Sequence, residues 1–182
     1  AEQCAQKALS IDDANPKAND LMGWLHYYQR DFDQAIEYEK KAVALAPNDH
    51  WRVHCLGYMM LFTGRYEDAI ALEKRSLRLS PSEGQCQLNI LGWAYYRSKQ
   101  YNEGIAALKK CIVLNPQFVL PHLGLIAIYS ELERDEEAKH HAEQVLRIDP
   151  EFSIEGHWKL WPDKIQAEVE RMNRAWRKAG LK

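Results

Sequence analysis

Three neighbouring residues have side chains that could bind a metal ion. His50 and His54 are four residues apart, and Cys55 follows directly. On a helix this spacing places two imidazoles on one face, where they could hold a metal for a hydrolytic reaction. However, no glutamate follows His50 as a base, and the sequence suggests no third ligand. We therefore expect solvent-facing or groove-facing histidines, no metal and no cofactor, with a metal-assisted hydrolase as a remaining alternative.

The other polar clusters show no catalytic pattern. His140 and His141 point about 100 degrees apart on a helix, so they cannot readily chelate one ion. The acidic residues within 133–137 fall on a turn and a helix start, where negative charge favours the helix dipole. The chain contains no Gly-rich phosphate loop and no G-x-S-x-G motif. We expect no catalytic residues and no enzyme activity.

Composition disfavours several classes of partner. The chain has 24 Lys and Arg residues against 26 Asp and Glu residues, for a formal net charge of −2. This balance provides no basic surface for nucleic acid or an anionic membrane. No apolar run approaches the roughly 20 residues that cross a bilayer. The four cysteines form no C-x-x-C pair, which fits a reducing cytoplasm.

Four prolines recur at a regular interval and indicate how the chain is organised. The spacing between successive members, Pro47, Pro81, Pro116 and Pro150, is about 34 residues. Each follows an apolar stretch, and each should end a helix because proline has no N–H to donate. Such a period predicts a solenoid of stacked helical hairpins.

Other sets of residues recur at the same interval of about 34 residues, and we call each such set of equivalent positions a column. One column contains Gly23, Gly57 and Gly92 after an apolar residue, and an aromatic column contains Phe32, Tyr66 and Tyr101. Small residues fill two further columns: Ala35, Ala69, Gly104 and Ala138, and then Ala42, Ser76 and Cys111. This pattern resembles the tetratricopeptide repeat family over about residues 1 to 150. The resemblance implies an all-α fold, a right-handed superhelical solenoid of helix-turn-helix repeats with a C-terminal capping helix.

The columns also predict the limits of the elements. We expect first helices near 17–29, 50–62, 84–97 and 118–131, and second helices near 33–46, 67–79, 102–114 and 135–147. Four repeats should then occupy about 15–48, 49–83, 84–117 and 118–151. Ala8 stands one full period before Ala42, so residues 1–14 are expected to be the second helix of a truncated repeat. That suggests a piece of a longer protein, with a naturally short chain as the alternative.

The residue after each column glycine should face the inner surface, since it is turned by about 100 degrees on its helix. These residues and their helical neighbours are strongly aromatic over three repeats. The predicted partner-binding groove comprises Trp24, Tyr27, Tyr28, Tyr58, Phe62, Asn89, Trp93, Tyr96 and Arg97. Trp and Tyr offer large rigid contact area, which suits an extended or helical peptide. Alternatively, these rings pack on one another or are covered by the chain's own tail.

One known specificity within the family can be tested on the sequence. Members that hold the C-terminal carboxylate of heat-shock chaperones use a clamp of Lys, Arg and Asn on this face. The corresponding column here reads Asp20, His54, Asn89 and Leu123. Only Asn89, with Arg97 nearby, suits such a clamp, so we do not expect recognition of chaperone tails.

After Pro150 the residues no longer match the repeat columns, and the sequence predicts a helix of a different kind. Ile165, Val169, Met172 and Trp176 form an apolar stripe within residues 163–178. Asp163, after Pro162, marks an N-cap region, and Gly180 is expected to end this helix. We expect residues 151–182 to form a capping tail buried against the last hairpin or in the groove. A docking helix for a partner or a second copy is the alternative.

The tail carries a second resemblance. Residues 150–154, Trp158, Pro162 and residues 177–181 are similar to the end of certain bacterial tetratricopeptide regions. Those regions follow class III adenylate cyclase or winged-helix DNA-binding domains in one polypeptide. The resemblance implies a regulatory segment whose catalysis or DNA binding is located elsewhere.

Together these patterns predict a protein-protein interaction scaffold. We expect the C-terminal repeat region of a larger bacterial signalling or regulatory protein that binds a protein or peptide in the aromatic groove. The alternative is a homo-oligomerisation element that pairs two copies through the open first end or the C-terminal helix.

Overall fold

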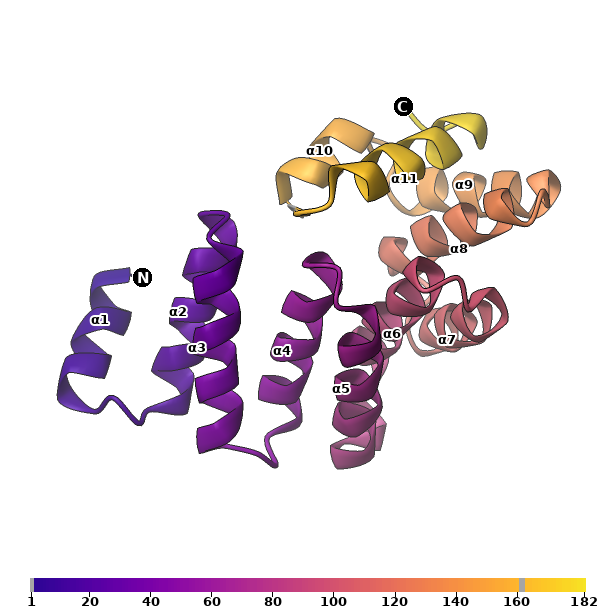
Figure 1. Cartoon of the computed structure of the whole chain (residues 1–182). Helices are drawn as coiled ribbons and strands as arrows, with labels where there is room; N and C mark the ends of the chain where they lie inside the picture. The colour runs from indigo at the N-terminus through magenta and orange to yellow at the C-terminus, as the bar shows by residue number, and fades with distance from the viewer. Residues whose placement is uncertain (1, 161–162) are drawn as a thin grey trace. The chain divides into compact units, whose positions relative to one another are not determined.

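The computed structural model describes residues 2–160 and 163–182, and in these ranges the chain forms helices and no strand (Figure 1). The all-α helical-repeat fold is therefore confirmed. Residue 1 and Pro162, one of the residues behind the second resemblance, lie outside the described ranges. The helices are, in chain order, α1 (Glu2–Ile11), α2 (Pro16–Tyr28), α3 (Phe32–Leu45), α4 (His50–Phe62), α5 (Tyr66–Leu79), η1 (Pro81–Glu83), α6 (Gln85–Arg97), α7 (Tyr101–Leu114), α8 (Val119–Glu131), α9 (Asp135–Ile148), α10 (Ile154–Leu160) and α11 (Gln166–Lys178).

Each second helix of the repeats ends two residues before a column proline. For example, α3 ends at Leu45 before Pro47, and α7 ends at Leu114 before Pro116. Two first helices begin at side-chain caps, since Asn15 accepts hydrogen bonds from the first turn of α2 and Asp49 does so for α4. The observed limits of the repeat helices agree with the predicted ones to within about two residues.

The turn inside each hairpin repeats one backbone conformation. Arg30, Gly64, Lys99 and Glu133 have φ values of 63°, 86°, 62° and 57°. The amide of Asp31 bonds to the carbonyl of His26, and equivalent bonds close the other three turns. This pattern is the Schellman ending of a helix, which requires the left-handed conformation that glycine adopts with least strain.

The helices group into two compact units, residues 1–83 and 84–182. In unit 1, α2 packs against α3 and α4 against α5, with α1 lying against α2. In unit 2, α6 packs against α7 and α8 against α9, while α11 packs against α8 (Figure 1). Each unit thus contains two complete hairpins.

The column glycines permit close contact between the two helices of a hairpin. A Cβ added to Gly23 would lie 2.7 Å from Oε1 of Glu39, and one added to Gly92 would overlap the side chain of Leu108. Gly57 has the same relation to Glu73. The side chain from the second helix therefore lies directly over the glycine, where even a methyl group cannot fit.

The tail differs from the prediction in two respects. Helix α10 was not predicted, because its seven residues show no repeated apolar step. Helix α11 begins three residues after Asp163, within the predicted N-cap region, but its N-cap is Ile165 and not Asp163 itself. Asp163 instead accepts a hydrogen bond from the amide of Ile165 and pairs with a buried arginine, Arg97.

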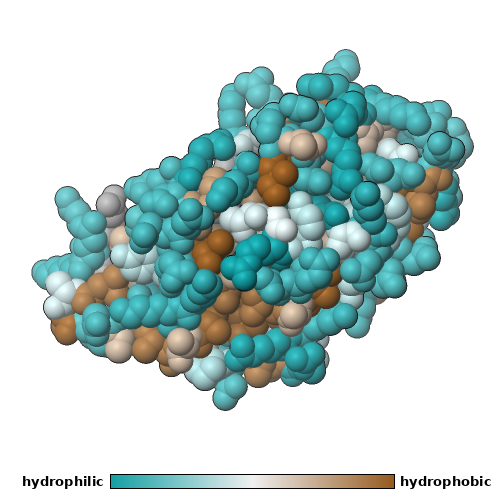
Figure 2. Space-filling model, in the orientation of Figure 1, coloured by the Kyte–Doolittle hydropathy of each residue, from teal (hydrophilic) through white to brown (hydrophobic). Residues whose placement is uncertain are grey.

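The visible surface is mostly hydrophilic, with hydrophobic residues gathered toward its lower side (Figure 2). Of the helices in the described ranges, none has the length and apolar character that a membrane crossing requires.

The contact between Gly92 and Leu108 gives a direct test of the hairpin packing. We expect Gly92→Ala to lower the free energy of unfolding by about 1–3 kcal/mol through overpacking. Leu108→Ala alone should cost about 2–5 kcal/mol, because it leaves a cavity. The double variant should cost at least about 1 kcal/mol less than the sum, since the smaller side chain makes room for the new methyl group. Urea denaturation followed by circular dichroism measures all four proteins, and strictly additive effects would contradict the packing described.

Candidate protein-interaction surface

Two first helices of unit 1 carry aromatic side chains at equivalent positions. Trp24 follows Gly23 on α2, and Tyr58 follows Gly57 on α4. The centroids of the two rings are 5.0 Å apart. Because both positions recur with the repeat, the stacking of hairpins brings the rings together.

Three more rings extend this contact into a surface that we call the aromatic wall. Tyr27 and Tyr28 lie one turn after Trp24, with centroids 5.8 and 6.1 Å from it. On α4, Phe62 lies 4.6 Å from Tyr58. The aromatic wall therefore comprises Trp24, Tyr27, Tyr28, Tyr58 and Phe62, all predicted groove residues.

The aromatic wall has a buried and an accessible layer. Tyr27 is fully buried and Tyr58 is 5% exposed, and their hydroxyl oxygens are 3.3 Å apart. Trp24 and Phe62 are half-buried, and Tyr28 is 56% exposed. The inner tyrosines hold the wall together, so a partner would contact the three outer rings.

The equivalent face of unit 2 is covered by the chain's own tail. The rings of Trp93 and of Trp176 on α11 pack in a T-shaped arrangement, with centroids 6.4 Å apart and an interplanar angle of 83°. The guanidinium of Arg171 lies 4.4 Å from the ring centroid of Tyr96. Trp93 and Tyr96 are 7% and 0% exposed. This face of α6 already binds a helix.

A buried ion pair holds the tail in this position. The guanidinium of Arg97 donates to the carboxylate of Asp163, and the two side chains are 1% and 0% exposed. Trp176 donates its indole N–H to the carbonyl of Leu123 at 3.0 Å. Asn89, the remaining predicted groove residue, is 3% exposed. Removing one member of such a buried pair leaves an uncompensated charge, so this contact fixes where the tail docks.

Burial also changes the protonation of groups at this contact. It raises the pKa of the Tyr96 hydroxyl, although the charge of Arg171 opposes the change. It lowers the pKa of His157 on α10 to about 4. The His157 ring lies 4.8 Å from Trp158 and 5.1 Å from Trp176, between centroids. A neutral imidazole is therefore part of the docked tail.

Two buried carboxyl groups lie behind the aromatic wall of unit 1. Glu73 contacts Nδ1 of His54 with both oxygens at 3.0 Å, and burial raises the pKa of Glu73 to about 7. Glu39, one repeat earlier, is fully buried, and burial followed by the charge of Asp20 raises its pKa to about 9. Arg52 pairs with Asp20 at 2.8 Å. Both glutamates occupy the position that lies over a column glycine.

The expectation for the histidine pair is wrong for His54. This side chain is 4% exposed and binds Glu73, so it faces neither solvent nor an open groove. His50 is half-buried at the start of α4. At the other pair, Nδ1 of His141 lies 2.9 Å from Nδ1 of His122, while His140 is exposed. Within the described ranges, no histidine belongs to a group of three potential metal ligands.

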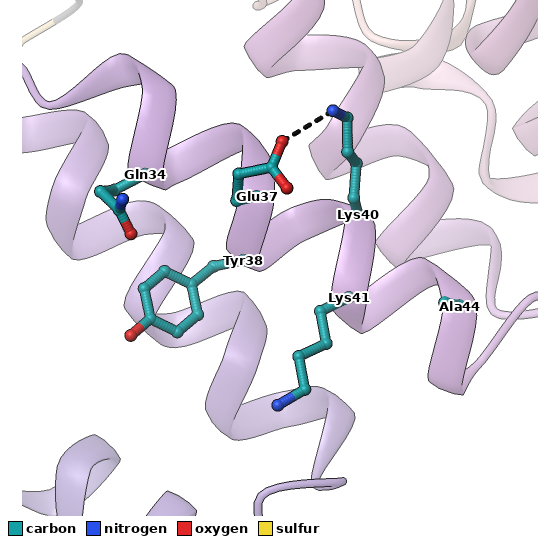
Figure 3. A pocket seen from close by; sticks show the side chains of 6 residues that line it. All are labelled: Gln34, Glu37, Tyr38, Lys40, Lys41 and Ala44. Atoms are coloured by element: carbon teal, nitrogen blue, oxygen red, sulfur yellow. Dashed lines mark hydrogen bonds and ion pairs between the residues drawn. The ribbon is translucent and has the colours of Figure 1, made fainter.

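A surface depression on α3 does not form a second site. Six side chains of this single helix line it: Gln34, Glu37, Tyr38, Lys40, Lys41 and Ala44 (Figure 3). Glu37 and Lys40 form an exposed ion pair at 2.7 Å. The polar groups point along the helix surface and do not converge on one point, so the depression lacks the features of a ligand pocket.

The sequence analysis did not identify the glutamates buried in unit 1 or the tail residues that contact α6 in unit 2. Glu39 and Glu73 had a signal, because they are one period apart in a column that continues as Leu108 and Ala142. A charged residue in an apolar column indicates a buried polar contact. Asp163 and Arg171 had no comparable signal, since their partners are on helices remote in sequence.

The fold and this surface define a class of protein. Stacked hairpins with aromatic side chains on their first helices are typical of helical-repeat binding scaffolds. The comparison with known families is specific. One tetratricopeptide repeat model matches residues 16–49 and 127–152, and a second matches residues 87–118, together about half of the chain. The chain belongs to the tetratricopeptide repeat family, a family of non-catalytic scaffolds.

Individual relatives are distant. The chain is 26% identical over 155 residues to the tetratricopeptide repeat-containing protein trd-1 of Caenorhabditis elegans, covering 85% of this chain and 19% of that protein. It therefore spans about a fifth of the length of this curated relative.

Solved structures share the fold at low sequence identity. PilW, a type IV pilus biogenesis factor, is 16% identical with a TM-score of 0.78, covering 96% of this chain and 79% of that chain. YrrB, described as a protein with an unusual peptide-binding site, is 16% identical with a TM-score of 0.67, covering 98% and 92%. At these identities the similarity establishes the fold alone.

His157 provides a pH test of the docked tail. In the unfolded chain its pKa should be about 6.5, whereas in the folded chain burial lowers it to about 4. The stabilising effect is fully present above pH 6.5 and is lost as the pH falls towards 4, because only the unfolded chain takes up the proton. We expect His157→Phe to keep the packing and to reduce the loss of stability between pH 7 and 5 by about 1–2 kcal/mol. Urea titrations at several pH values measure this difference, and an unchanged pH profile in the variant would contradict the assignment.

Proposed function

We propose that the aromatic wall of unit 1 binds an amphipathic helix of a partner protein, so that the chain acts as a protein-protein interaction scaffold. The observation that supports this proposal is that the equivalent face of unit 2 already binds a helix, α11. Trp93 and Tyr96 hold α11, and the repeat-equivalent residues in unit 1 are Trp24 and Tyr27. Because repeats place equivalent residues on the same face, Trp24 and Tyr27 present an aromatic pair that corresponds to the one that holds α11.

The contacts of α11 indicate what the partner helix should carry. Trp176 and Met172 are buried in unit 2, and Arg171 lies over Tyr96. We therefore propose a helix with an arginine and, five residues later, a large apolar residue, which is the spacing of Arg171 and Trp176. The apolar residue would pack on Trp24, and the arginine would lie over a tyrosine ring such as that of Tyr28.

The wider setting of the chain is also part of the proposal. We place this region in a larger bacterial signalling or regulatory protein of the cytoplasm, with residues 151–182 as the cap of the last repeat. The similarity of the tail to bacterial repeat regions supports this setting. The matched curated relative is much longer than the matched segment. In that protein, therefore, the similar region is part of a larger chain, as we propose here.

Pairing of two copies is the second candidate. It would have to use a surface other than the apolar stripe of α11, because Met172 and Trp176 are already buried. Sedimentation across a wide concentration range separates the two functions. A monomer at all concentrations would exclude self-association of this chain.

The chain supplies its own probe for the aromatic wall. We expect a labelled synthetic peptide of residues 163–182 to bind the intact protein, because the wall of unit 1 remains accessible. Trp24→Ala should weaken that binding at least about tenfold, the effect typical of a central aromatic contact. Tyr28→Ala tests the same surface at an exposed position, where folding is least affected. Fluorescence anisotropy measures the affinity.

Trp51→Ala is the matched control, since Trp51 is a 43% exposed tryptophan of α4 outside the aromatic wall. Its affinity for the peptide should equal that of the unchanged protein. Equal affinity of the Trp24 and Tyr28 variants, or no binding of the peptide at all, would reject the wall as a helix-binding surface.

A further inference from the structure

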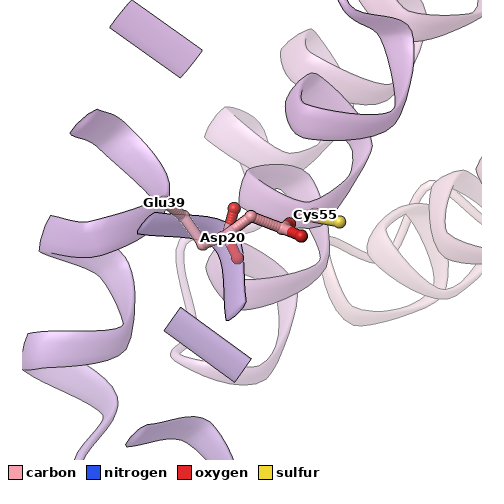
Figure 4. A group of neighbouring side chains, drawn as sticks. All are labelled: Asp20, Glu39 and Cys55. Atoms are coloured by element: carbon pink, nitrogen blue, oxygen red, sulfur yellow. The ribbon is translucent and has the colours of Figure 1, made fainter. Parts of the chain in front are cut away.

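Three side chains with metal-binding atoms meet behind the aromatic wall. Asp20, Glu39 and Cys55 are contributed by α2, α3 and α4, and their ligand atoms all lie within 4.8 Å of one another (Figure 4). Glu39 and Cys55 are fully buried, and the side chain of Asp20 is 15% exposed. The cluster is thus enclosed, with one edge near the surface at Asp20.

The oxygens in this cluster have no hydrogen-bond donor outside it. In the described part of the chain, neither carboxyl oxygen of Glu39 nor Oδ1 of Asp20 has a partner from the surrounding protein, and their interactions are with one another and with Cys55. The other oxygen of Asp20 accepts from Arg52 at 2.8 Å, which leaves Oδ1 directed elsewhere. Burying three acceptors with no outside donor is costly, so these oxygens beside one thiol indicate that a positively charged species can be accommodated among them.

Comparison of equivalent positions in the four repeats shows that Asp20, Glu39 and Cys55 are not repeated together in another copy. The column of Asp20 continues as His54, Asn89 and Leu123, and in the next copy His54 satisfies Glu73 directly. The column of Cys55 otherwise contains Leu21, Ile90 and Gly124. Among the described residues, two carboxyls and a thiol therefore meet only at the junction of the first hairpin with α4. Glu73, the counterpart of Glu39, is paired with His54, and no other copy has a cysteine at the position of Cys55.

We propose that Asp20, Glu39 and Cys55 bind one divalent transition-metal ion of the zinc type, with water as the fourth ligand. A thiolate with two carboxylate oxygens suits Zn²⁺, with metal–sulfur and metal–oxygen distances of about 2.3 and about 2.1 Å. Ligand atoms in such a tetrahedral site are about 3.5 Å apart, so the side chains need to move by about 1 Å or less. Arg52 would orient Asp20 from outside the coordination sphere.

Charge balance permits this occupant. A divalent cation with one thiolate and two carboxylates has a net charge of −1, which the guanidinium of Arg52, 2.8 Å from Asp20, would balance. Ligands that carry a proton release it when the metal binds.

The test uses the untagged chain, freed of metal with a chelator and kept reduced. We expect calorimetry with Zn²⁺ to give one site per chain. With Co²⁺ we expect a thiolate-to-cobalt charge-transfer band in the near ultraviolet. Cys55→Ser should abolish that band, and Glu39→Gln should weaken binding at least about tenfold, as expected for loss of a ligand. Glutamine has nearly the size and shape of glutamate, so Glu39→Gln should preserve the packing over Gly23 and hence the fold.

Two matched controls separate this site from non-specific binding. Cys111 is also a fully buried cysteine, but its thiol donates to the carbonyl of Gln85. Glu73 is also a fully buried glutamate, but it is paired with His54. Cys111→Ser and Glu73→Gln should leave the cobalt band and the affinity unchanged. The proposal fails if no metal binds, if cobalt binds without the sulfur band, or if the control variants lose as much affinity as the Cys55 and Glu39 variants.

Discussion

In three of the four complete hairpins, close contact between the two helices depends on a glycine of the first helix, a position without a Cβ atom. The fourth hairpin has Ile126 at this position. The second helix places a side chain directly over that position, as Leu108 does over Gly92. The residues at this place, Glu39, Glu73 and Leu108, are fully buried whatever their type. In unit 1 they are glutamates, so the contact that stacks the helices also buries carboxyl groups behind the aromatic wall. The same position therefore accounts for the packing of the two helices and for the raised pKa values of the buried glutamates.

The repeat helices could be predicted closely because their limits are set locally. A proline two residues after the last helical residue and a left-handed turn residue act within a few positions of the chain. Helix α10 could not be predicted, since its seven residues are held by contacts outside the helix. The amide of Ile154 bonds to the carbonyl of Lys182, and Trp158 donates to Asn173. Such elements are defined by tertiary contacts that periodicity does not record.

The same distinction explains what could be predicted of the surface. Helical geometry alone brings Trp24 and Tyr58 to one face, and the structure has their ring centroids 5.0 Å apart. Exposure is a different property, because it depends on what covers the face. Trp93 has the same place in its repeat as Trp24, yet α11 covers it through Trp176, a residue much later in the chain. No local pattern contains that information, so the sequence reveals the face but not whether it is open.

The equivalent faces of the two units differ at a column position through which unit 2 binds the tail. In unit 2, Arg97 breaks the aromatic column of Tyr28 and Phe62, and its charge is paired with that of Asp163 of the tail. A buried arginine without that partner would be strongly unfavourable, so this unit is committed to its own chain. In unit 1 the same positions are aromatic and carry no charge that demands a fixed partner. One column residue thus distinguishes the face that the chain's own tail covers from the face for which we propose a partner.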